Sequence, residues 1–499
     1  MPSPRSPARC LLWLLALWPL FAGAGDDTLR IGSKRFTEAY IVAQVLAQTA
    51  APHAQVEVRA GLGNTAIVYE ALRSGQIDVY PEYAGTIALE ILKDPSATTP
   101  EAMNRQLAPL GLGVAVPLGF NDGYALALRA ADARRLGIHK LGDLAQHADL
   151  KLGLSNEFLG RSDGWAGLAQ RYRLPQRPLG IDHGLAYDAL AAGQVDAIDI
   201  YTTDAKIQHL GLAVLADDLG YFPRYDALLL YRLDLPQRLP AAWRALQGLA
   251  GRIDEPAMIA MNARAELQGV AFEVIARDFL QGGTKADAAS RGFTARLLGD
   301  DLGRLTRQHL LLVGVSVALA ALIGIPLGVL VADRPAWRAV VLGATGVLQT
   351  VPSLALLAVL ISLLGAIGTL PALIALTLYA LLPILRNTCA GLAGVPEGLK
   401  MAATALGLTP RDRLLQIELP LAFPTLVAGV RTATVIAVGT ATIAAFIGAG
   451  GYGERIVTGL ALNDRELLLA GALPAALLAL LVEGGFELLE SWMRRRQGR

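Results

Sequence analysis

Four tyrosines occupy paired positions in the first half of the chain and could together bind a diffuse cation. Tyr83 and Tyr201 lie 118 residues apart within an internal repeat, and Tyr124 and Tyr225 each follow a turn and open an apolar run. A quaternary ammonium group has no N–H to donate, so the faces of aromatic rings supply its recognition. At ~2 kcal/mol for each desolvated ring, four rings would approach micromolar affinity before ordering costs. Any single tyrosine is more often structural, with its hydroxyl satisfied at a core edge, but the paired placement favours one shared site.

The repeat predicts two similar lobes. Residues 69–78 and 187–196 share Tyr, Ala, Leu, Gly, Gln and Asp at matching places, in the pattern of a helix that ends at glycine and feeds a strand. Two such units predict two α/β lobes, at about 28–119 plus 226–280 and at about 123–222. Because open α/β sheets bind ligands at the carboxyl ends of their strands, Tyr83 and Tyr201 are expected to face a common cleft.

A carboxylate on the ligand would need hydrogen-bond donors. Lys34, Ser33, Asn64 and Thr65 lie in loops after early predicted strands and are the candidates. A lone lysine on a loop is more often solvated, so this assignment requires the loops to turn toward the cleft. Trp165 either packs under the cleft or fills the core of the second lobe.

Composition divides the chain into a soluble half and a membrane half. Of 499 residues, 53% are hydrophobic and 17% are charged, and the apolar residues concentrate in the second half. Five apolar segments, at about 310–332, 339–364, 367–385, 421–447 and 467–486, are long enough to cross a bilayer. The net charge of +1 gives no electrostatic argument for a nucleic-acid partner. The six histidines show no metal-ligand spacing, so we expect no metal site.

Residues 1–24 have the features of a secretory signal peptide. Two arginines precede an apolar run, and Ala22-Gly23-Ala24 fits a cleavage site. An uncleaved anchor is the alternative, and either one exports the soluble half. Five crossings would then place the loops 333–338 and 386–420 and the C-terminus inside. Arginines in all three segments agree with the positive-inside rule.

Polar and ionisable residues interrupt the predicted spans. Residues 349–353 place a proline beside polar side chains, which is tolerated at membrane depth where the backbone faces protein or a water-filled path. Lining of a pathway and a packed kink both fit this break. Arg431 and Glu483 lie near span ends and either reach the interface or pair with each other.

A charged island at residues 400–420 stands between the apolar runs. Gly407 breaks an alanine-rich helix, Thr409 is placed to cap a second helix with Pro410 at its first position, and this helix is expected to end at Leu419-Pro420. The island resembles the cytoplasmic loop of ABC-importer permeases, which docks into a cleft on an ATPase subunit. The positions that match are Ala402, Ala403, Gly407, Ile417, Leu419 and Pro420, with Met401 in place of the usual glutamate. An ordinary helical hairpin is the alternative.

Further segments are similar to the importer family for glycine betaine, carnitine and choline. Residues 31–38, 61–65, 80–86 and 161–165 resemble its substrate-binding proteins, and residues 349–356 and 448–453 resemble its permeases. In that family a cage of tyrosines holds the quaternary ammonium, and the positions that correspond are Tyr83, Tyr124, Tyr201 and Tyr225. The resemblance implies a type II periplasmic-binding-protein fold at 25–280, a linker at 281–305 and an all-α permease domain of about five spans at 306–499.

We therefore expect an importer subunit for osmoprotectants of the glycine betaine, choline and carnitine type. It would lie in the bacterial inner membrane, with its binding domain on the periplasmic or extracellular side. The sequence contains no phosphate-binding loop for ATP, so we expect no cofactor on this chain, a permease homodimer and two copies of a separate ATPase that uses ATP. Import of another betaine such as ergothioneine, and a tethered receptor that does not transport, are the alternatives. An anchored enzyme is disfavoured because no nucleophile and base set is present.

Overall fold

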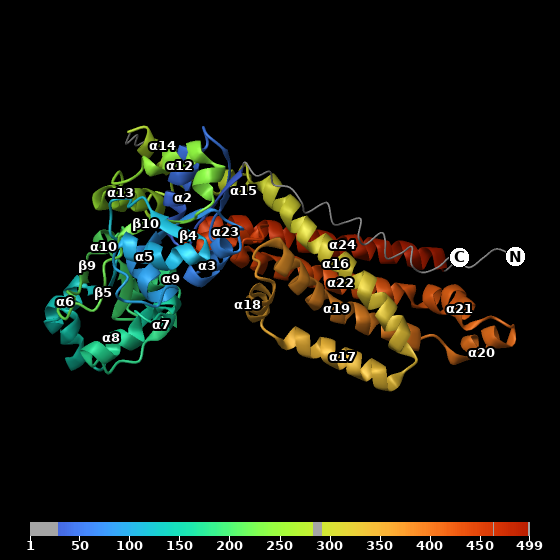
Figure 1. Cartoon of the computed structure of the whole chain (residues 1–499). Helices are drawn as coiled ribbons and strands as arrows, with labels where there is room; N and C mark the ends of the chain where they lie inside the picture. The colour runs from blue at the N-terminus through green and yellow to red at the C-terminus, as the bar shows by residue number, and fades with distance from the viewer. Residues whose placement is uncertain (1–27, 283–291, 463, 498–499) are drawn as a thin grey trace.

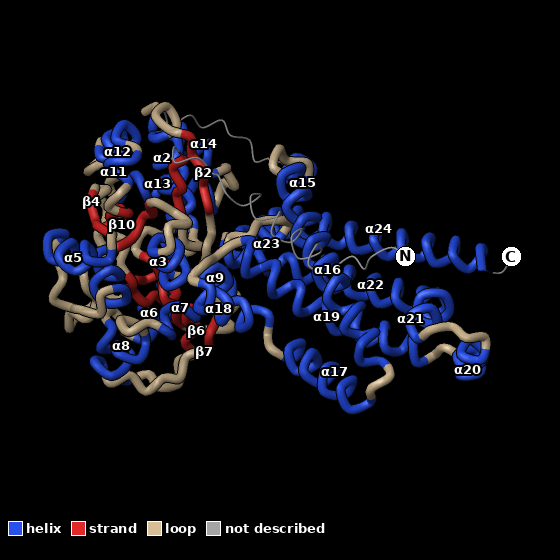
Figure 2. Tube along the Cα trace, turned by 45° about the vertical axis from the view of Figure 1, so that its right-hand side comes forward, coloured by secondary structure: helices blue, strands red, loops and turns tan. Residues whose placement is uncertain are grey.

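The computed structural model describes residues 28–282, 292–462 and 464–497, and places two α/β lobes at one end of a long helical bundle (Figure 1). The predicted signal peptide lies outside the described residues. The helices and strands of the lobes and the all-helical second half are distinguished in Figure 2.

Each lobe is built on one five-stranded mixed sheet. The first has the order β2-β1-β3-β10-β4 and the second β7-β6-β8-β5-β9, so the two orders correspond strand for strand. The strands of the first sheet are β1 (Thr28–Gly32), β2 (Gln55–Arg59), β3 (Val79–Tyr83), β4 (Leu112–Ala115) and β10 (Ala227–Arg232). Those of the second are β5 (Tyr124–Arg129), β6 (Leu152–Ser155), β7 (Leu179–Ile181), β8 (Ala197–Tyr201) and β9 (Leu212–Val214). The predicted two-lobe α/β fold is confirmed.

Helices cover both sheets. Those of the first lobe are α2 (Thr37–Ala50), α3 (Thr65–Arg73), α4 (Ala84–Thr86) with the π-turn Ile87–Ile91, α5 (Pro100–Leu107), α11 (Leu235–Arg238), α12 (Pro240–Gln247), α13 (Glu255–Glu266) and α14 (Phe272–Leu280). Those of the second are α6 (Ala130–Leu136), α7 (Asn156–Gly160), α8 (Trp165–Tyr172), α9 (His183–Ala191) and α10 (Lys206–His209). Short 3₁₀ turns lie at Ala108–Leu110 and Leu141–Gln146.

The internal repeat is visible in the structure as two identical helix-to-strand units. Helix α3 and strand β3 in the first lobe correspond to helix α9 and strand β8 in the second, and all four element bounds are displaced by 118 residues. Both helices begin with a side-chain cap, because Asn64 accepts from the Ile67 N–H and Asp182 accepts from the Gly184 N–H. The repeat therefore leaves Tyr83 and Tyr201 as the last residues of equivalent strands.

The chain crosses between the lobes twice, and the two crossing segments lie side by side. They run between β4 and β5 and between β9 and β10, and are joined by an antiparallel bridge between Asn121 and Asp226. The Tyr225 N–H donates to Asn121 Oδ1 at 2.7 Å, and the Ala227 N–H donates to the Phe120 carbonyl at 3.0 Å. This pairing holds Tyr124 and Tyr225 at the hinge side of the cleft.

The second half of the described chain is helical. Its elements are α15 (Phe293–Leu297), α16 (Leu302–Ala332), α17 (Pro335–Thr350), α18 (Ser353–Leu364), α19 (Thr369–Ala393), α20 (Glu397–Ala405), α21 (Pro410–Arg413), the π-turn Leu414–Glu418, α22 (Leu419–Ala441), the 3₁₀ turn Thr442–Ile447, α23 (Gly453–Ala461) and α24 (Arg465–Gln497). Four stretches of the described residues are long and apolar enough to span a membrane, and α17 with α18 forms a fifth that is bent by 99°. The predicted break at residues 349–353 is confirmed.

The bent pair makes one crossing. Helices α16 and α19 run parallel: a Cβ on Gly324 would lie 3.1 Å from Ile384, and one on Gly328 would lie 2.7 Å from Thr388. Because the chain must return between two parallel neighbours, α17 and α18 together carry it back, which gives five crossings. The α16–α17 turn, the charged island and the end of α24 consequently lie at the tip remote from the lobes (Figure 1).

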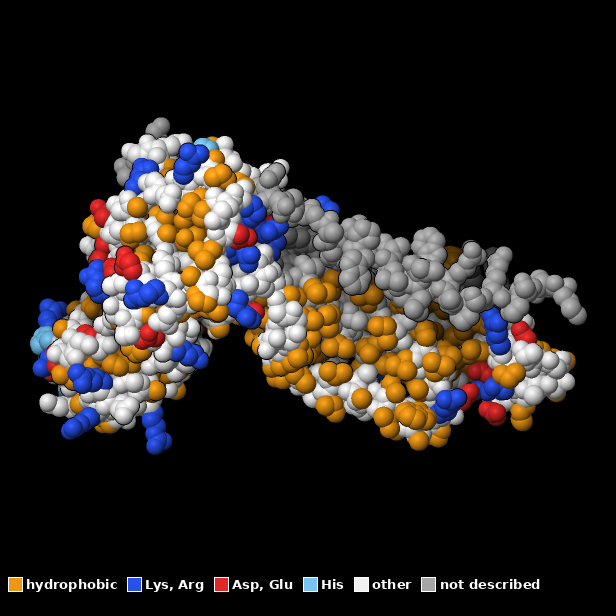
Figure 3. All heavy atoms as spheres, in the orientation of Figure 1, with side chains coloured by type: hydrophobic (Ala, Val, Ile, Leu, Met, Phe, Trp, Pro, Cys, Tyr) orange, Lys and Arg blue, Asp and Glu red, His pale blue; other side chains and the backbone are white. Residues whose placement is uncertain are grey.

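The surface agrees with this arrangement. Hydrophobic side chains gather over the helical half, whereas charged side chains lie on the lobes and at the remote tip (Figure 3). Within the bundle, Arg431 of α22 is ion-paired with Glu483 of α24 and lies 3.3 Å from Glu487 and 3.4 Å from Glu490. Pairing is thus the alternative that the structure selects for Arg431 and Glu483.

We expect cysteines introduced at Glu101 and at Arg411 to be labelled from opposite sides of the membrane. Glu101 is exposed on the first lobe, and Arg411 is exposed on the island at the remote tip. The two native cysteines would first be replaced by alanine, and an impermeant thiol reagent would be added to intact cells. Labelling of both positions from outside would contradict five crossings.

One expectation for the island is wrong. The second helix of the island does not end at Leu419-Pro420 but continues through the π-turn Leu414–Glu418 into α22. The Leu419 N–H bonds to the Leu414 carbonyl, and Pro420 follows within the first turn of α22. A proline inside a continuing helix lacks an N–H and its ring crowds the carbonyl one turn before it, and the wider π-turn just before Pro420 relieves this crowding. The π-turn therefore lets the helix pass a residue that would ordinarily stop it.

Candidate functional site

The four predicted tyrosines meet between the lobes. The Tyr124 ring centroid lies 5.2 Å from that of Tyr201 and 5.8 Å from that of Tyr225. Phe36 links Tyr83 to this group. Its ring centroid lies 6.1 Å from that of Tyr83 and 5.2 Å from that of Tyr201. All four tyrosines are at most 9% exposed. The rings therefore form one aromatic cluster to which both lobes contribute.

Strand pairing fixes the positions of these rings. Tyr124 opens β5 directly opposite Tyr201, which closes the antiparallel strand β8. In the first lobe, Tyr83 closes β3 opposite Ala227, two residues after Tyr225. The cluster is thus built where the ends of equivalent strands from both sheets face each other.

The cluster already presents ring faces to cations of the protein itself. Lys34 Nζ lies 5.2 Å from the centroid of Tyr83, and the guanidinium carbon of Arg161 lies 5.2 Å from the centroid of Tyr124. Both distances are within the range of a cation–π contact. The electrostatic character of the cluster therefore suits a positively charged group.

The predicted carboxylate donors have different surroundings. Lys34 is buried and ion-paired with Glu82, while Ser33 Oγ accepts from the Gly61 N–H at 2.9 Å. Asn64 is exposed and caps α3, and Thr65 Oγ1 is buried without a hydrogen-bond partner among the described residues. Of the four, the structure brings only Lys34 within cation–π distance of a predicted cage ring. Trp165 begins α8 and packs against the core of the lobe.

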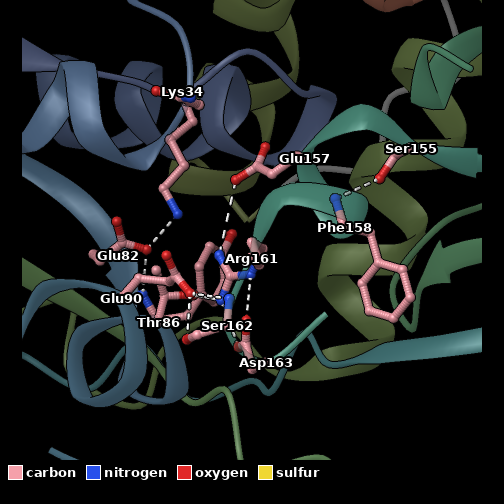
Figure 4. A network of polar contacts seen from close by, with 12 residues as sticks. Lys34, Glu82, Thr86, Glu90, Ser155, Glu157, Phe158, Arg161, Ser162 and Asp163 are labelled. Atoms are coloured by element: carbon pink, nitrogen blue, oxygen red, sulfur yellow. Dashed lines mark hydrogen bonds and ion pairs between the residues drawn. The ribbon is translucent and has the colours of Figure 1, made fainter. Parts of the chain in front are cut away.

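Sequence reasoning placed Arg161 in the segment 161–165 that resembles the family but gave it no role, and in the structure this residue connects the lobes (Figure 4). Its Nε and Nη2 atoms each lie 2.6 Å from a carboxylate oxygen of Asp163, and Nη2 donates to Thr86 Oγ1 of the first lobe at 3.2 Å. Burial opposes its charge, but Tyr124, Asp163 and Glu157 outweigh burial and hold the pKa of Arg161 above its ordinary value. Arg161 is therefore a permanent cation beside the cluster.

Neighbouring contacts also hold the lobes together. Ser162 Oγ donates to Glu90 of the first lobe at 2.6 Å, and the Tyr225 hydroxyl donates to Asp163 at 2.7 Å. Two sequence signals pointed to this network: the resemblance of residues 161–165 to the family, and a basic residue flanked by acids at 157 and 163, which is also common on solvated helices. The residues of the first lobe that Arg161 and Ser162 contact, Thr86 and Glu90, are distant from them in sequence.

The strand end at Tyr201 is fixed by a partly buried ion pair. The Tyr201 N–H donates to Asp204 Oδ2 at 2.9 Å, and His183 Nε2 lies 3.1 Å from the same oxygen. Burial alone would lower the pKa of His183, but the charge of Asp204 outweighs it and raises this pKa to about 9. A charged His183 thus neutralises Asp204 behind the cluster.

Both lobes touch the helical half next to the cluster. On the first lobe, the guanidinium of Arg35 lies 4.4 Å from the Phe446 ring centroid. On the second lobe, a Cβ on Gly184 would lie 2.8 Å from the Ala461 carbonyl oxygen. The segment from Phe446 to Leu462 is therefore in contact with both lobes while they are closed on each other.

At the remote tip, the island presents an exposed apolar surface. Gly407 ends α20 with φ +82°, its N–H bonds to the Thr404 carbonyl, and the Leu408 N–H bonds to the Ala403 carbonyl. This is the hydrogen-bond pattern of a Schellman motif. Met401 is 62% exposed and Leu406 is 80% exposed. The turn holds these side chains toward solvent.

Two protein-family models match this chain, one in its soluble half and one in its membrane half. Residues 27–282 match the family "Substrate binding domain of ABC-type glycine betaine transport system", and residues 324–495 match "Binding-protein-dependent transport system inner membrane component".

Two curated relatives illustrate the similarity. An ergothioneine transport permease/ergothioneine binding protein of Helicobacter pylori is 32% identical over 282 residues, which cover 54% of this chain and 50% of the relative. The chain thus spans about half the length of that relative. An osmoprotectant import permease protein of Salmonella typhimurium is 47% identical over 187 residues, which cover 36% of this chain and 86% of the relative. A crystal structure of a glycine betaine/carnitine/choline ABC transporter is 26% identical, covers 51% of this chain and 98% of its own, and has a TM-score of 0.44.

Proposed function

This chain belongs to the family of binding-protein-dependent ABC importers of the glycine betaine type, and we propose that it captures quaternary-ammonium compatible solutes and passes them through its own permease. Its role is transport and not catalysis. It is a multi-pass inner-membrane protein whose binding domain lies outside. Binding domain and permease are joined in one polypeptide.

The aromatic cluster between the lobes carries the substrate proposal. Four tyrosines from both lobes form one aromatic cluster, and two of their rings already face a Lys and an Arg of the protein. A trimethylammonium group would replace contacts of this kind without needing a hydrogen-bond acceptor. Arg161 and Lys34, each within reach of one ring, would serve a carboxylate on the same ligand. Glycine betaine, choline and carnitine share the cationic group.

We further propose that ATP is hydrolysed by a separate subunit that docks on the island. The exposed apolar face of α20 and the start of α21, which Thr409 caps, support this assignment. Together they form a protruding helical surface at the remote tip, where a subunit could dock. Two copies of this chain would form the pathway and recruit two ATPase subunits. A tethered receptor that does not transport would need neither this docking surface nor the bent α17–α18 pair.

Calorimetry on the full chain tests the substrate class. We expect at least one of glycine betaine, choline and carnitine to bind with micromolar affinity, and an analogue without the quaternary ammonium to bind far more weakly. Ergothioneine is also a trimethylammonium betaine, so it belongs in the same panel as the alternative ligand. Absence of binding by every quaternary ammonium would contradict the proposal. Uptake into vesicles with the ATPase present separates an importer from a receptor.

Truncation of a cage ring should weaken binding selectively. Tyr83→Ala and Tyr201→Ala each remove one aromatic face, so we expect the affinity for a quaternary ammonium to fall by about 5- to 30-fold, which corresponds to ~1–2 kcal/mol. Tyr201→Phe keeps the face and should cost less. Calorimetry of the three variants checks this order, and unchanged affinity in both alanine variants would remove these rings from the site.

A further inference from the structure

Glu38 joins a cage ring of the first lobe to a hydroxyl of the second. It lies in the first turn of α2 and is 2% exposed. The Tyr83 hydroxyl donates to Glu38 Oε1, and Thr203 Oγ1 donates to Glu38 Oε2 at 2.6 Å. Thr203 follows strand β8, so the second contact exists only while the lobes are closed.

Thr203 lies between two carboxyl groups but has one hydrogen to give. Its Oγ1 is also 2.9 Å from Asp122 Oδ1, and Asp122 is 6% exposed in the crossing segment before β5. A hydroxyl donates one hydrogen bond and otherwise accepts. The Thr203 N–H also donates to Asp122 Oδ1, at 3.2 Å, so this oxygen already accepts one hydrogen bond from the backbone. If Thr203 Oγ1 donates to Glu38, its contact with Asp122 becomes a second hydrogen bond only when Asp122 is protonated. Two buried carboxyl groups thus share one hydroxyl hydrogen, and one proton on the pair would complete the arrangement.

No positively charged side chain pairs with Glu38 or Asp122 among the described residues, so a cation does not take the place of this proton. The neighbouring charged groups are Asp204 with its partner His183, Glu266 on α13, and Lys206 on α10, and Tyr187 donates to Asp204. Asn262 on α13 donates to the Thr203 carbonyl at 3.1 Å. Within the described ranges, neither Glu38 nor Asp122 forms an ion pair with a Lys, Arg or His.

Electrostatics agree with the hydrogen-bond count. Burial raises the pKa of the Glu38 carboxyl to about 7. Burial, together with the charges of Glu38 and Asp204, raises the pKa of the Asp122 carboxyl well above its ordinary value. Two interacting acids of this kind release their protons in two separate steps, so one proton remains on the pair at neutral pH.

We propose that Glu38, Thr203 and Asp122 form a one-proton lock between the lobes, in which closure on the ligand takes up one proton. In the open form Thr203 leaves Glu38 and water reaches both acids, which then ionise. In the closed form the single negative charge that remains lies against the hydroxyl of Tyr83 and makes its ring a better partner for a cation. Glu38 is thus a positioning residue for the cage. This inference rests on the proposed function, because it names how the same site closes.

The lock predicts a specific pH dependence. Because the closed form binds the proton more tightly than the open form, ligand affinity should fall as the pH rises from the ordinary carboxyl range through neutral pH, until the closed form also releases the proton. The fall is at most about tenfold per pH unit for one proton. Asp122→Asn keeps an oxygen that accepts from the Thr203 N–H but has no titrating proton, so binding should survive with a flatter pH profile. Asp122→Ala removes both contacts with Thr203 and should weaken binding at every pH.

Proton uptake on the full-length protein in lipid nanodiscs tests the lock. Calorimetric titration with glycine betaine and with choline, in buffers of different ionisation enthalpy, should report uptake approaching one proton below neutral pH. Glu38→Gln and Asp122→Asn should abolish that uptake, whereas the exposed Glu101→Gln should not change it. Binding without uptake, or uptake that persists in both variants, would overturn the lock.

Infrared spectroscopy separates this failure from failure of the proposed function. At neutral pH we expect the carbonyl band of a buried protonated carboxyl group, which should disappear in Asp122→Asn and stay in Glu101→Gln. If neither ligand binds, the substrate proposal fails and this band alone decides the lock. Absence of the band overturns it.

Discussion

Gly407→Val is expected to abolish ATP-driven uptake while ligand binding by the lobes stays unchanged. Gly407 has φ +82° and completes the Schellman motif that ends α20. A β-branched residue reaches this conformation only with strain of about 1–3 kcal/mol, so the turn would open and α20 would leave its position. Because no heavy atom lies within 4 Å of the Cβ position, the loss comes from the backbone of this chain or from a subunit docked on the island.

Two variants separate these causes. Gly137→Val places the same strain on the second lobe, where φ is +69° and the Cβ position is equally open, so uptake should be retained. Asparagine tolerates a positive φ, so Gly407→Asn should retain much more transport than Gly407→Val. Uptake into vesicles with the co-expressed ATPase is the measurement. Normal uptake by Gly407→Val would mean that the island does not couple hydrolysis to transport.

The sequence predicted well those parts of the fold that depend on residues close together in the chain. The displacement of 118 residues placed Tyr83 and Tyr201 at equivalent strand ends, because one helix-to-strand unit is used twice. The hydrophobic runs predicted the membrane helices for the same reason, since each run is contiguous. The break after Thr350 could be predicted because a proline follows within two residues.

Features that depend on distant partners were not predictable. Arg161 is held by the nearby Asp163 but also reaches Thr86 of the other lobe, and Thr203 meets Glu38 across 165 residues of sequence. No local pattern indicated either contact between the lobes. Pro420 was taken as a helix end because the π-turn Leu414–Glu418, which carries the helix past it, has no signal in the local sequence.

The contact between the second lobe and the permease is a meeting of two helix ends. Helix α9 begins at His183, and the last carbonyl groups of α23 lie against it. A helix start carries partial positive charge and a helix end partial negative charge, so the two ends attract each other. Gly184 allows the approach, because a Cβ there would lie 2.8 Å from the Ala461 carbonyl oxygen and 2.9 Å from that of Leu460.

Gly184→Val should therefore uncouple capture from transport. The added side chain would meet backbone atoms of α23 that cannot rotate away, so the second lobe and the segment from Phe446 to Leu462 must separate. We expect uptake to fall by roughly tenfold or more, since a displacement of about 1 Å is enough to disrupt a positioned site. Glycine betaine affinity should fall much less than uptake, because the added side chain meets α23 and not a cage ring, although His183 beside it contacts Tyr201. The matched control is Gly160→Val, whose Cβ position has no neighbour within 4 Å. Equal uptake by the two variants would show that the closed lobes do not need this contact to deliver their ligand.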